Sequence, residues 1–337
     1  MAIAAPALDA TALTSWLDDN GIPGKDEGLT VEPLSGGMTN LVYRLRRGGQ
    51  DLVLRMAPGG MSERAGRTMV REYAVLTALE GTAVPHARAW ALGADPAVLG
   101  GTFYVMDYVD GWSPAASDLW PAPFDADAAL RRALALELVE GAAKLSRVDW
   151  EARGLSGLGR PDGFHERQVD RWLRQFNEIA FRPLPGLQDA AAWLRGNQPA
   201  SWSPGIMHGD YQFHNVMYAH GAPARLAAIV DWELSTIGDP LLDLAWVLMS
   251  RDWNESKFDL TGMPPDAELV AHYEQHSGRS TAGIDYYLVL ARFKMAVILE
   301  GGVARSRTDA RHERAGSFAD ISVNLAAEAG AMARRLS

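Results

Sequence analysis

The sequence contains no cysteine among its 337 residues. The chain therefore cannot form a disulfide, a thiolate zinc site or an iron–sulfur cluster, and it has no thiol nucleophile. The absence fits a reducing compartment, and we expect a cytoplasmic protein. Basic residues are also in the minority, since 32 lysines and arginines face 42 acidic residues and give a net charge of −10. This balance speaks against nucleic acid as a partner.

Long hydrophobic runs are missing as well. The longest purely apolar stretches, such as residues 226–230, are far below the roughly 20 residues that a membrane span needs, so we expect no membrane partner. The first ten residues carry no basic residue and no long apolar core, which predicts that no signal peptide is present. Absent motifs exclude a P-loop, the G-x-S-x-G elbow of hydrolases and the H-E-x-x-H site of zincins.

Hydrophobic patterning divides the chain into a β-rich part of about 110 residues and a larger, mostly helical part. Periodicity and turn signals predict strands at residues 31–34, 41–46, 52–56 and 102–109, and helices at 9–20, 62–79, 241–250 and 286–299. Within the helical part, residues 206–231 predict one β-hairpin. The pattern indicates an α+β protein.

One polar constellation surrounds this predicted hairpin. Asp210 follows His208, Asn215 comes five residues later, and Asp231 lies at the end of the returning strand. Phosphoryl transfer from ATP needs a carboxylate that orients the attacking hydroxyl, together with hard oxygen ligands for Mg²⁺. A hairpin would bring Asn215 and Asp231 close together, and both offer such oxygens. The alternative interpretation is a polar loop and turn.

This segment resembles the aminoglycoside phosphotransferase family, relatives of the protein kinases. Residues 229–246, IVDWELSTIGDPLLDLAW, resemble the branch that is fused to acyl-CoA dehydrogenases. The resemblance runs from about residue 29 to about residue 314. It implies a bilobal protein-kinase-like fold, with a small antiparallel-sheet N-lobe at residues 1–109, including a helical extension at 1–28, and a larger helical C-lobe at 110–337.

The resemblance also implies roles for the residues of the constellation. Asp210 would be the catalytic base, and Asn215 and Asp231 would be metal ligands. Glu233 matches the second acid of the family's D-x-E motif, either as a further ligand or as a solvated carboxylate. Three residues would support the catalytic loop without taking part in the chemistry: His208, Asp239 and Asp243. Asp239 with Pro240 is also typical of a helix start.

The N-lobe would then bind the nucleotide. Its phosphate loop would consist of Gly36, Gly37, Met38, Thr39 and Asn40, although a Gly-Gly turn alone is more often an ordinary hairpin. Arg55 stands where protein kinases carry a strand lysine, and Glu72 is its expected acidic partner; a guanidinium can bind phosphate oxygens through two hydrogen bonds. The alternative is an ordinary surface Arg and Glu. The backbone of Asp107 and Val109 would pair with adenine.

The predicted activity is ATP- and Mg²⁺-dependent phosphate transfer to a small-molecule hydroxyl, with a hydroxyacyl or hydroxy-acid compound as the favoured acceptor. The alternatives are a catalytically weak nucleotide-binding regulator and an aminoglycoside-modifying enzyme. A basic set late in the chain would either meet CoA phosphates or form a solvated helix face: Arg292, Lys294, Arg305, Arg307, Arg311 and Arg314. Trp232, Trp246 and Trp253 would line an acceptor pocket or belong to the core. The sequence indicates neither the oligomeric state nor a preference for ATP over GTP.

Overall fold

The computed structural model describes residues 8–34, 40–57, 63–114, 119–254, 260–308 and 315–337. The chain forms two compact units, each discontinuous in sequence. Unit 1 comprises Met1–Gly141, Val148–Leu158 and Phe213–Ser235, and unit 2 comprises Ala142–Arg147, Gly159–Gln212 and Thr236–Ser337. These units are defined by internal contacts, and the lobe boundary after residue 109 stays a prediction.

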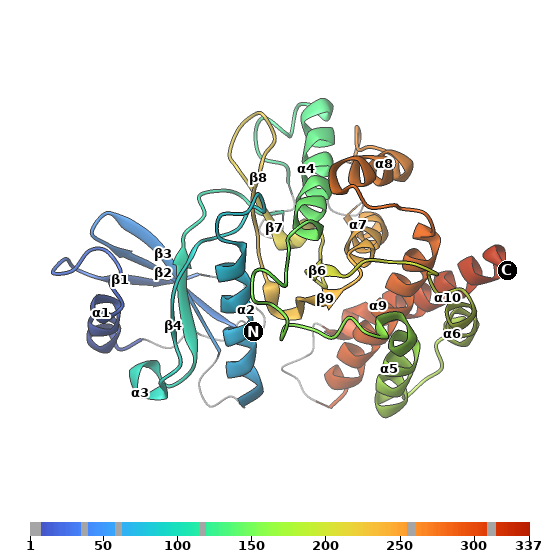
Figure 1. Cartoon of the computed structure of the whole chain (residues 1–337), viewed down its shortest axis with the longest axis horizontal. Coiled ribbons are helices and arrows are strands. Elements are labelled where there is room, and N and C mark those ends of the chain that lie inside the picture. Colours follow the sequence, from blue (N-terminus) through green and yellow to red (C-terminus); the bar gives the residue numbers. More distant parts are fainter. Residues whose placement is uncertain (1–7, 35–39, 58–62, 115–118, 255–259, 309–314) are drawn as a thin grey trace. The chain divides into compact units, whose positions relative to one another are not determined.

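A five-stranded antiparallel sheet forms the base of unit 1 (Figure 1). Its strands follow the order β1 (Thr30–Pro33), β2 (Leu41–Arg47), β3 (Gln50–Met56), β5 (Phe103–Asp107) and β4 (Ala89–Gly93). Gly48 and Gly49 make the β2–β3 turn, and both have positive φ angles that suit glycine. The four strands predicted from the alternating pattern are confirmed, and β4 adds a fifth.

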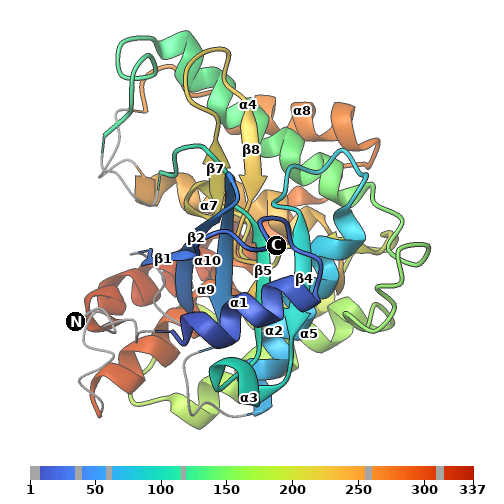
Figure 2. The ribbon, with the colours of Figure 1, turned by 90° about the vertical axis from the view of Figure 1, so that its left-hand side faces the viewer.

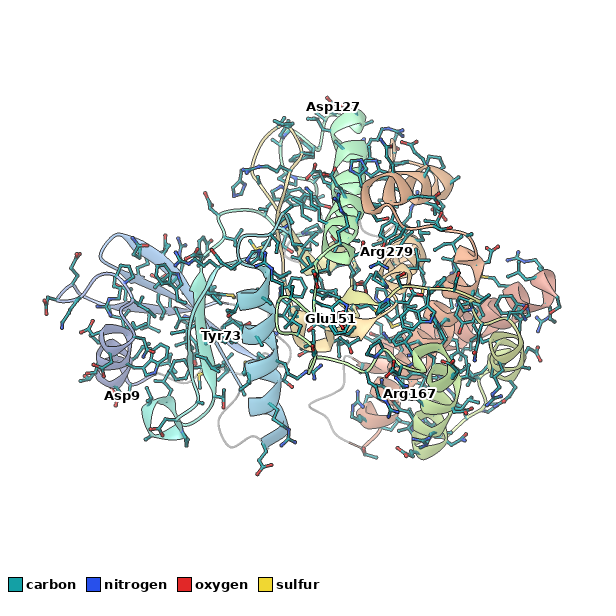
Figure 3. The ribbon with its side chains drawn as sticks, in the orientation of Figure 1. Asp9, Tyr73, Asp127, Glu151, Arg167 and Arg279 are labelled. Carbon is teal, nitrogen blue, oxygen red and sulfur yellow. The ribbon has the colours of Figure 1, made fainter. Side chains whose placement is uncertain are left out.

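Helices cover both faces of this sheet (Figure 2). On one face, α1 (Ala10–Asp19) packs Leu13 and Leu17 against the buried side chains of the strands. Asp9, labelled in Figure 3, caps α1 by accepting the N–H groups of Thr11 and Ala12. On the other face lies α2 (Glu63–Leu79), and Arg55 in β3 points to this side because neighbouring strand residues alternate between faces. The short helix α3 (Pro96–Leu99) precedes β5.

Unit 1 also contains the predicted hairpin, which consists of β7 (Val216–Tyr218) and β8 (Leu226–Ile229). The 3₁₀ turns η1 (Phe213–Asn215) and η2 (Trp232–Leu234) flank the hairpin. The hydroxyl of Tyr218 donates to the Leu134 carbonyl in α4 (Ala128–Ser146), which fixes the hairpin against that helix. The hairpin places residues 215 and 231 at its open end.

In the described part of unit 2, helices predominate, and β6 (Gly205–Met207) pairs with β9 (Thr236–Gly238) in a short two-stranded sheet. Its helices are α5 (Phe164–Ile179), α6 (Leu187–Gly196), α7 (Leu241–Asn254), α8 (Asp266–Ser277), α9 (Ile284–Ser306) and α10 (Ala319–Leu336). The long helix α9 packs against α5, α6, α7 and α10. Because neighbours surround it, α9 is apolar on most sides.

An ion pair joins the segment between α5 and α6 of unit 2 to the buried Glu300 of α9. Arg182 donates through Nε and Nη2 to the two carboxylate oxygens of Glu300, each at 2.7 Å, and Ser322 donates to the same carboxylate. This pair fastens the segment between α5 and α6 to α9 and α10. Within the described residues, no helix is both long and apolar enough to cross a bilayer.

Candidate active site

The predicted phosphate loop is only partly described. Gly36, Gly37, Met38 and Thr39 lie outside the described residues, and Asn40 immediately precedes β2. The role of the loop therefore stays a prediction.

Arg55 connects two carboxylates of unit 1. Its Nε lies 2.9 Å from Oε2 of Glu72, and its Nη2 donates to Oδ1 of Asp231 over 2.6 Å. The hydroxyl of Tyr104 donates to the same Glu72 oxygen over 2.8 Å. The side chains of Arg55 and Glu72 are only 13% and 1% exposed, so the alternative of an ordinary surface pair was wrong. We call Arg55, Glu72, Tyr104 and Asp231 the arginine cluster.

Burial and charge act against each other in the arginine cluster. Burial raises the pKa of the Glu72 carboxyl to about 7, while the Arg55 guanidinium and the Tyr104 hydroxyl oppose the rise. Burial alone would lower the pKa of Arg55, but the charges of Glu72 and Asp231 outweigh it and the pKa is raised. Arg55 is therefore a permanent cation at this position.

Two of the predicted metal ligands, Asn215 and Asp231, lie at the open end of the hairpin. The backbone N–H of Val230 donates to the Asn215 carbonyl over 3.0 Å, so Asp231 follows directly on a residue paired with Asn215. Asp231 has a φ of 68°, in the left-handed region that aspartate and asparagine tolerate better than most residues. Its side chain is 37% exposed. An amide oxygen and a partly exposed carboxylate form a donor set that fits Mg²⁺.

Helix α2 helps to hold Asp231 near Arg55. Arg71, beside Glu72 in the sequence, donates through Nη2 to the carbonyls of Leu158 and Ser235 at 2.8 and 3.0 Å. Ser235 follows η2, which begins directly after Asp231. Glu233 lies within η2 and is partly exposed, which leaves both of its predicted interpretations open.

Asp210 belongs to unit 2, whereas Asn215 and Asp231 belong to unit 1. Its Oδ1 accepts hydrogen bonds from the indole Nε1 of Trp246 at 2.7 Å and from Nε2 of Gln212 at 2.8 Å. Both donors are neutral, so neither of these two hydrogen bonds is an ion pair.

The residues before Asp210 are held by buried groups of unit 2. Asp243 in α7 accepts the N–H groups of His208 and Gly209 at 2.6 and 2.9 Å. Burial raises the pKa of Asp243, and His208 and the two backbone N–H groups oppose the rise. Lys294 in α9 donates to the Gly209 carbonyl over 3.1 Å. Both polar backbone groups of Gly209 are thus fixed, at a positive φ of 86°.

Asp239 lies at the start of α7, as the sequence predicts. Its carboxylate accepts the Leu241 N–H at 3.2 Å, the Tyr287 hydroxyl at 2.6 Å and Nε2 of His165 at 3.0 Å. Asp239, Asp243 and His208 are all buried. These contacts suit supporting roles, which stay predictions.

Part of the backbone of the predicted hinge is hydrogen-bonded within unit 1. The N–H of Asp107 donates to the Arg88 carbonyl over 2.9 Å, and the N–H of Tyr108 donates to Asp51 over 3.1 Å. The N–H of Asp107 is therefore used within the sheet. The Asp107 carbonyl and the Val109 backbone stay the predicted adenine partners.

Two contacts of the site escaped the sequence analysis. Lys294 was assigned to a late basic set, but its ammonium lies 4.5 Å from the ring centroid of Trp246 and contacts the loop of Asp210. Its position within the apolar stretch of residues 286–299 was the sequence signal that could have indicated burial of this lysine. Tyr104 is paired with Arg55 in the β3–β5 register. Trp232 belongs to the core, and the Trp253 side chain, Arg311 and Arg314 lie outside the description.

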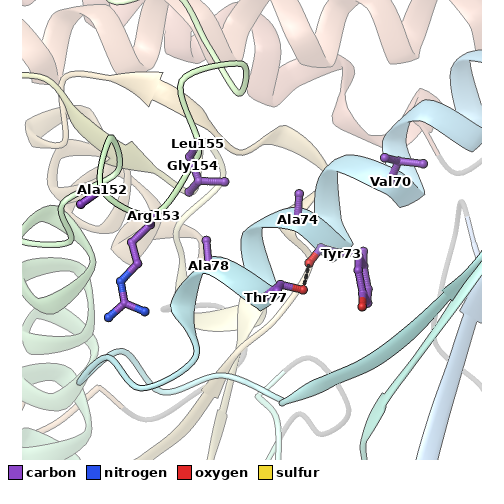
Figure 4. Close-up of a pocket in the computed structure, with 9 residues that line it drawn as sticks. All are labelled: Val70, Tyr73, Ala74, Thr77, Ala78, Ala152, Arg153, Gly154 and Leu155. Carbon is purple, nitrogen blue, oxygen red and sulfur yellow. Dashed lines mark hydrogen bonds between the residues drawn. The ribbon is translucent and has the colours of Figure 1, made fainter. Parts of the chain in front are cut away.

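Figure 4 shows a pocket elsewhere in unit 1, on the outer face of α2. It measures about 500 Å³ and is lined by Val70, Tyr73, Ala74, Thr77 and Ala78 of α2 together with residues 152–155. Its lining includes no predicted site residue among those described. The pocket is thus separate from the arginine cluster.

Comparison with known families now decides the classification. The model of the phosphotransferase enzyme family, APH, matches residues 30–287. The chain belongs to this family. The recognition based on the Asp210, Asn215 and Asp231 motif is thereby confirmed.

Solved structures of the family confirm the α+β, protein-kinase-like fold. A putative aminoglycoside phosphotransferase from Ralstonia eutropha JMP134 matches with a TM-score of 0.82 and 30% identity, covering 98% of this chain and 99% of that one. A thermostable mutant of aminoglycoside phosphotransferase APH(4)-Ia, in a ternary complex with ADP and hygromycin B, has a TM-score of 0.61. It covers 94% of this chain and 97% of that one, and its 14% identity shows likeness of fold alone.

Curated relatives carry the name of the branch that residues 229–246 suggested. The chain is 34% identical to acyl-CoA dehydrogenase family member 11 of Gallus gallus, over 94% of this chain and 42% of the relative. It is 30% identical to the probable acyl-CoA dehydrogenase IBR3 of Arabidopsis thaliana, over 88% of this chain and 39% of the relative. The chain therefore spans about two fifths of the length of these relatives.

Proposed function

We propose that this phosphotransferase moves the γ-phosphate of ATP to a hydroxyl group of a small hydroxy acid or hydroxyacyl compound, with Mg²⁺ as its cofactor. The observation that carries the proposal is the arginine cluster, in which Arg55, Glu72 and Asp231 come together from three separate segments. A cation fixed beside a metal-binding carboxylate suits a phosphate-bearing ligand.

Arg55 is proposed to bind phosphate oxygens. Its guanidinium keeps its charge, and Glu72 holds it from the α2 side. Asn215 and Asp231 would hold Mg²⁺, which when bound neutralises charge on the phosphates. Since Asp231 is now in contact with Arg55 through Oδ1, we expect Arg55 to share this carboxylate with the metal or to turn toward the phosphates.

Asp210 is proposed to orient the acceptor hydroxyl and to accept its proton. A general base must lie within hydrogen-bond reach of the proton that it takes, and a fixed carboxylate meets this requirement best. Trp246 and Gln212 fix one oxygen of Asp210. Most of the acceleration would come from positioning and charge neutralisation, since the transferred group demands little covalent work from the protein.

The acyl-type acceptor is supported by the names of the curated relatives, which are acyl-CoA dehydrogenases. An aminoglycoside acceptor stays the second candidate, because the solved neighbours include aminoglycoside phosphotransferases. The weak-regulator alternative depended on Arg55 as a departure from lysine. The close pairing of Arg55 with Glu72 and Asp231 speaks against it.

A coupled assay of ADP release tests the proposal. Wild-type protein is screened with Mg²⁺-ATP against short and long hydroxy acids, their CoA thioesters and aminoglycosides. We expect release that depends on both Mg²⁺ and a hydroxylated acyl compound, and not on the matched compound without the hydroxyl. Release that depends on aminoglycosides alone would support the second candidate. Absence of release with every acceptor would overturn the proposed function.

A further inference from the structure

Two side chains from different helices meet beside Asp210 in unit 2. Trp246 lies three residues after Asp243 in α7, so both residues face the same side of the helix. Asp243 binds the backbone before Asp210, and Trp246 binds the Asp210 carboxylate itself. Lys294 from α9 lies over the Trp246 ring, 4.5 Å from its centroid, and also donates to the Gly209 carbonyl.

We propose that Trp246 and Lys294 are positioning residues for Asp210. The indole N–H fixes the rotation of the carboxylate, and the ammonium fixes both the plane of the indole and the peptide that precedes Asp210. This inference rests on the proposed function, in which Asp210 is the base.

The need for such a device follows from the loop. Gly209 has no side chain to pack and adopts a positive φ, so this backbone would be free to rotate without external contacts. Reacting groups must be held closely, since a displacement of about 1 Å can cost about 100-fold in rate. A tryptophan suits the purpose because its rigid ring has only two side-chain torsions. A cation over the ring stabilises its orientation, because the face of the ring carries negative charge.

A purely structural role would favour a different residue at position 294. The side chain of Lys294 lies near two indole rings, those of Trp246 and Trp172, the second at 5.7 Å. Burial lowers the pKa of Lys294 to about 8; Arg171 also lowers it, and Asp243 and Asp210 oppose the decrease. Methionine would fill the same space without burying a charge. Burying the Lys294 ammonium therefore lowers the stability of the protein. Compared with an apolar side chain of similar length, lysine offers only its hydrogen bond and its charge at this position.

Steady-state kinetics provide the first test. Trp246→Phe keeps an aromatic ring but removes the N–H donor, and Lys294→Met keeps the length but removes the charge. We expect kcat to fall about 10- to 100-fold in each, while KM for ATP stays within about twofold. Lys294→Arg should recover most of the loss. Trp193→Phe and Lys25→Met are the matched controls and should match wild type. A kcat within twofold of wild type in both test variants would overturn the proposal.

Nuclear magnetic resonance tests the geometry without turnover. In the ¹H–¹⁵N spectrum of the full chain, the indole signal of Trp246 is identified by its loss in Trp246→Phe. We expect this signal to move in Asp210→Asn and in Lys294→Met, and to stay in place in Lys25→Met. If the indole signal does not move in Lys294→Met, the proposal is overturned, whether or not the wild-type enzyme is active. If wild type turns over no acceptor, the proposed function fails while this measurement still decides the geometry.

Folding is checked for each variant by circular dichroism and thermal melting. Should Lys294→Met not fold, Lys294→Gln, which keeps a neutral donor, takes its place in both measurements. We then expect the indole signal to move, but by less than it would if the donor were lost completely. We still expect kcat to be reduced, because the charge is absent. Wild-type kcat in this variant would overturn the role of the ammonium.

Discussion

The two units hold their central carboxylates in different ways. In unit 1, Asp231 contacts the permanent cation Arg55, which is itself paired with the buried Glu72. In unit 2, Asp210 accepts hydrogen bonds from an indole and an amide, both of which are neutral. Each arrangement suits the role proposed for its carboxylate.

The Arg55 guanidinium binds one oxygen of Asp231 through a charge-assisted hydrogen bond. Asp210 is instead oriented by two neutral hydrogen-bond donors, with the Lys294 ammonium nearby. The contrast predicts that the two carboxylates fail differently when they are changed, and the following variants test that difference.

The largest effect is expected for Asp210→Ala. Loss of the base should lower kcat by roughly 10²–10⁴, or about 3–5.5 kcal/mol, because general-base catalysis typically contributes this much. KM for ATP should change little. Steady-state kinetics with Asp189→Ala, an exposed acid of α6, as the control would measure this. Wild-type turnover would contradict the assignment of Asp210.

The second effect is expected for Asp231→Asn. Asparagine tolerates the left-handed φ, so the fold should persist. We expect turnover to fall about 10- to 100-fold and the Mg²⁺ concentration for half-maximal activity to rise, since the charged ligand is lost. A Mg²⁺ titration compares it with Glu233→Gln, which should shift the same midpoint only if Glu233 is also a ligand. An unchanged midpoint in Asp231→Asn would argue against a metal role.

A smaller effect is expected for Arg55→Met. Hydrogen bonds to charged groups contribute about 1.5–3 kcal/mol, so KM for ATP should rise at least about tenfold. Arg55→Lys should retain part of the affinity because it keeps the charge. Nucleotide titrations alongside Arg67→Met, an exposed α2 residue paired with Glu63, give the comparison. Equal KM values in Arg55→Met and wild type would separate Arg55 from the phosphates.

The smallest effect concerns pH. The pKa of Lys294 is lowered to about 8, so the ammonium loses its proton as the pH rises through that value. Its cation–π contact with Trp246 should be lost, but the neutral amine can still donate to the Gly209 carbonyl, so we expect kcat to fall only about two- to fivefold between pH 7 and 9.5. Lys294→Arg should flatten this decrease, since arginine stays charged, whereas Arg55→Met should leave it in place. A decrease that persists in Lys294→Arg would assign it to another group.

The sequence predicted the local parts of the site well. Asp210, Asn215 and Asp231 lie on either side of a hairpin that short-range patterns identify, and the cap at Asp9 depends on neighbouring residues alone. Long-range partners were harder. Arg55 and Asp231 are 176 residues apart, and Lys294 and Gly209 are 85 apart, so only the folded chain brings them together.

The strand pairing beside the predicted hinge is irregular. Strand β4 pairs with β5 through an irregularity between Ala89 and Ala91, and the Arg88 carbonyl beside it receives the Asp107 N–H. Hydrophobic alternation predicts which strands exist, but it does not predict where an interrupted ladder places one extra hydrogen bond.

Because each unit is discontinuous in sequence, the chain can be divided into fragments in only a few ways. The chain passes from one unit to the other between residues 212 and 213, inside the five-residue interval from Asp210 to Asn215, and returns between 235 and 236. A fragment ending at residue 109 would lack Asp231 and the hairpin that belongs with its sheet. No single cut yields a polypeptide holding all of unit 1 alone; a fragment retaining all of the residues proposed to bind the nucleotide and the metal would need residues 213–235 grafted back through an artificial linker.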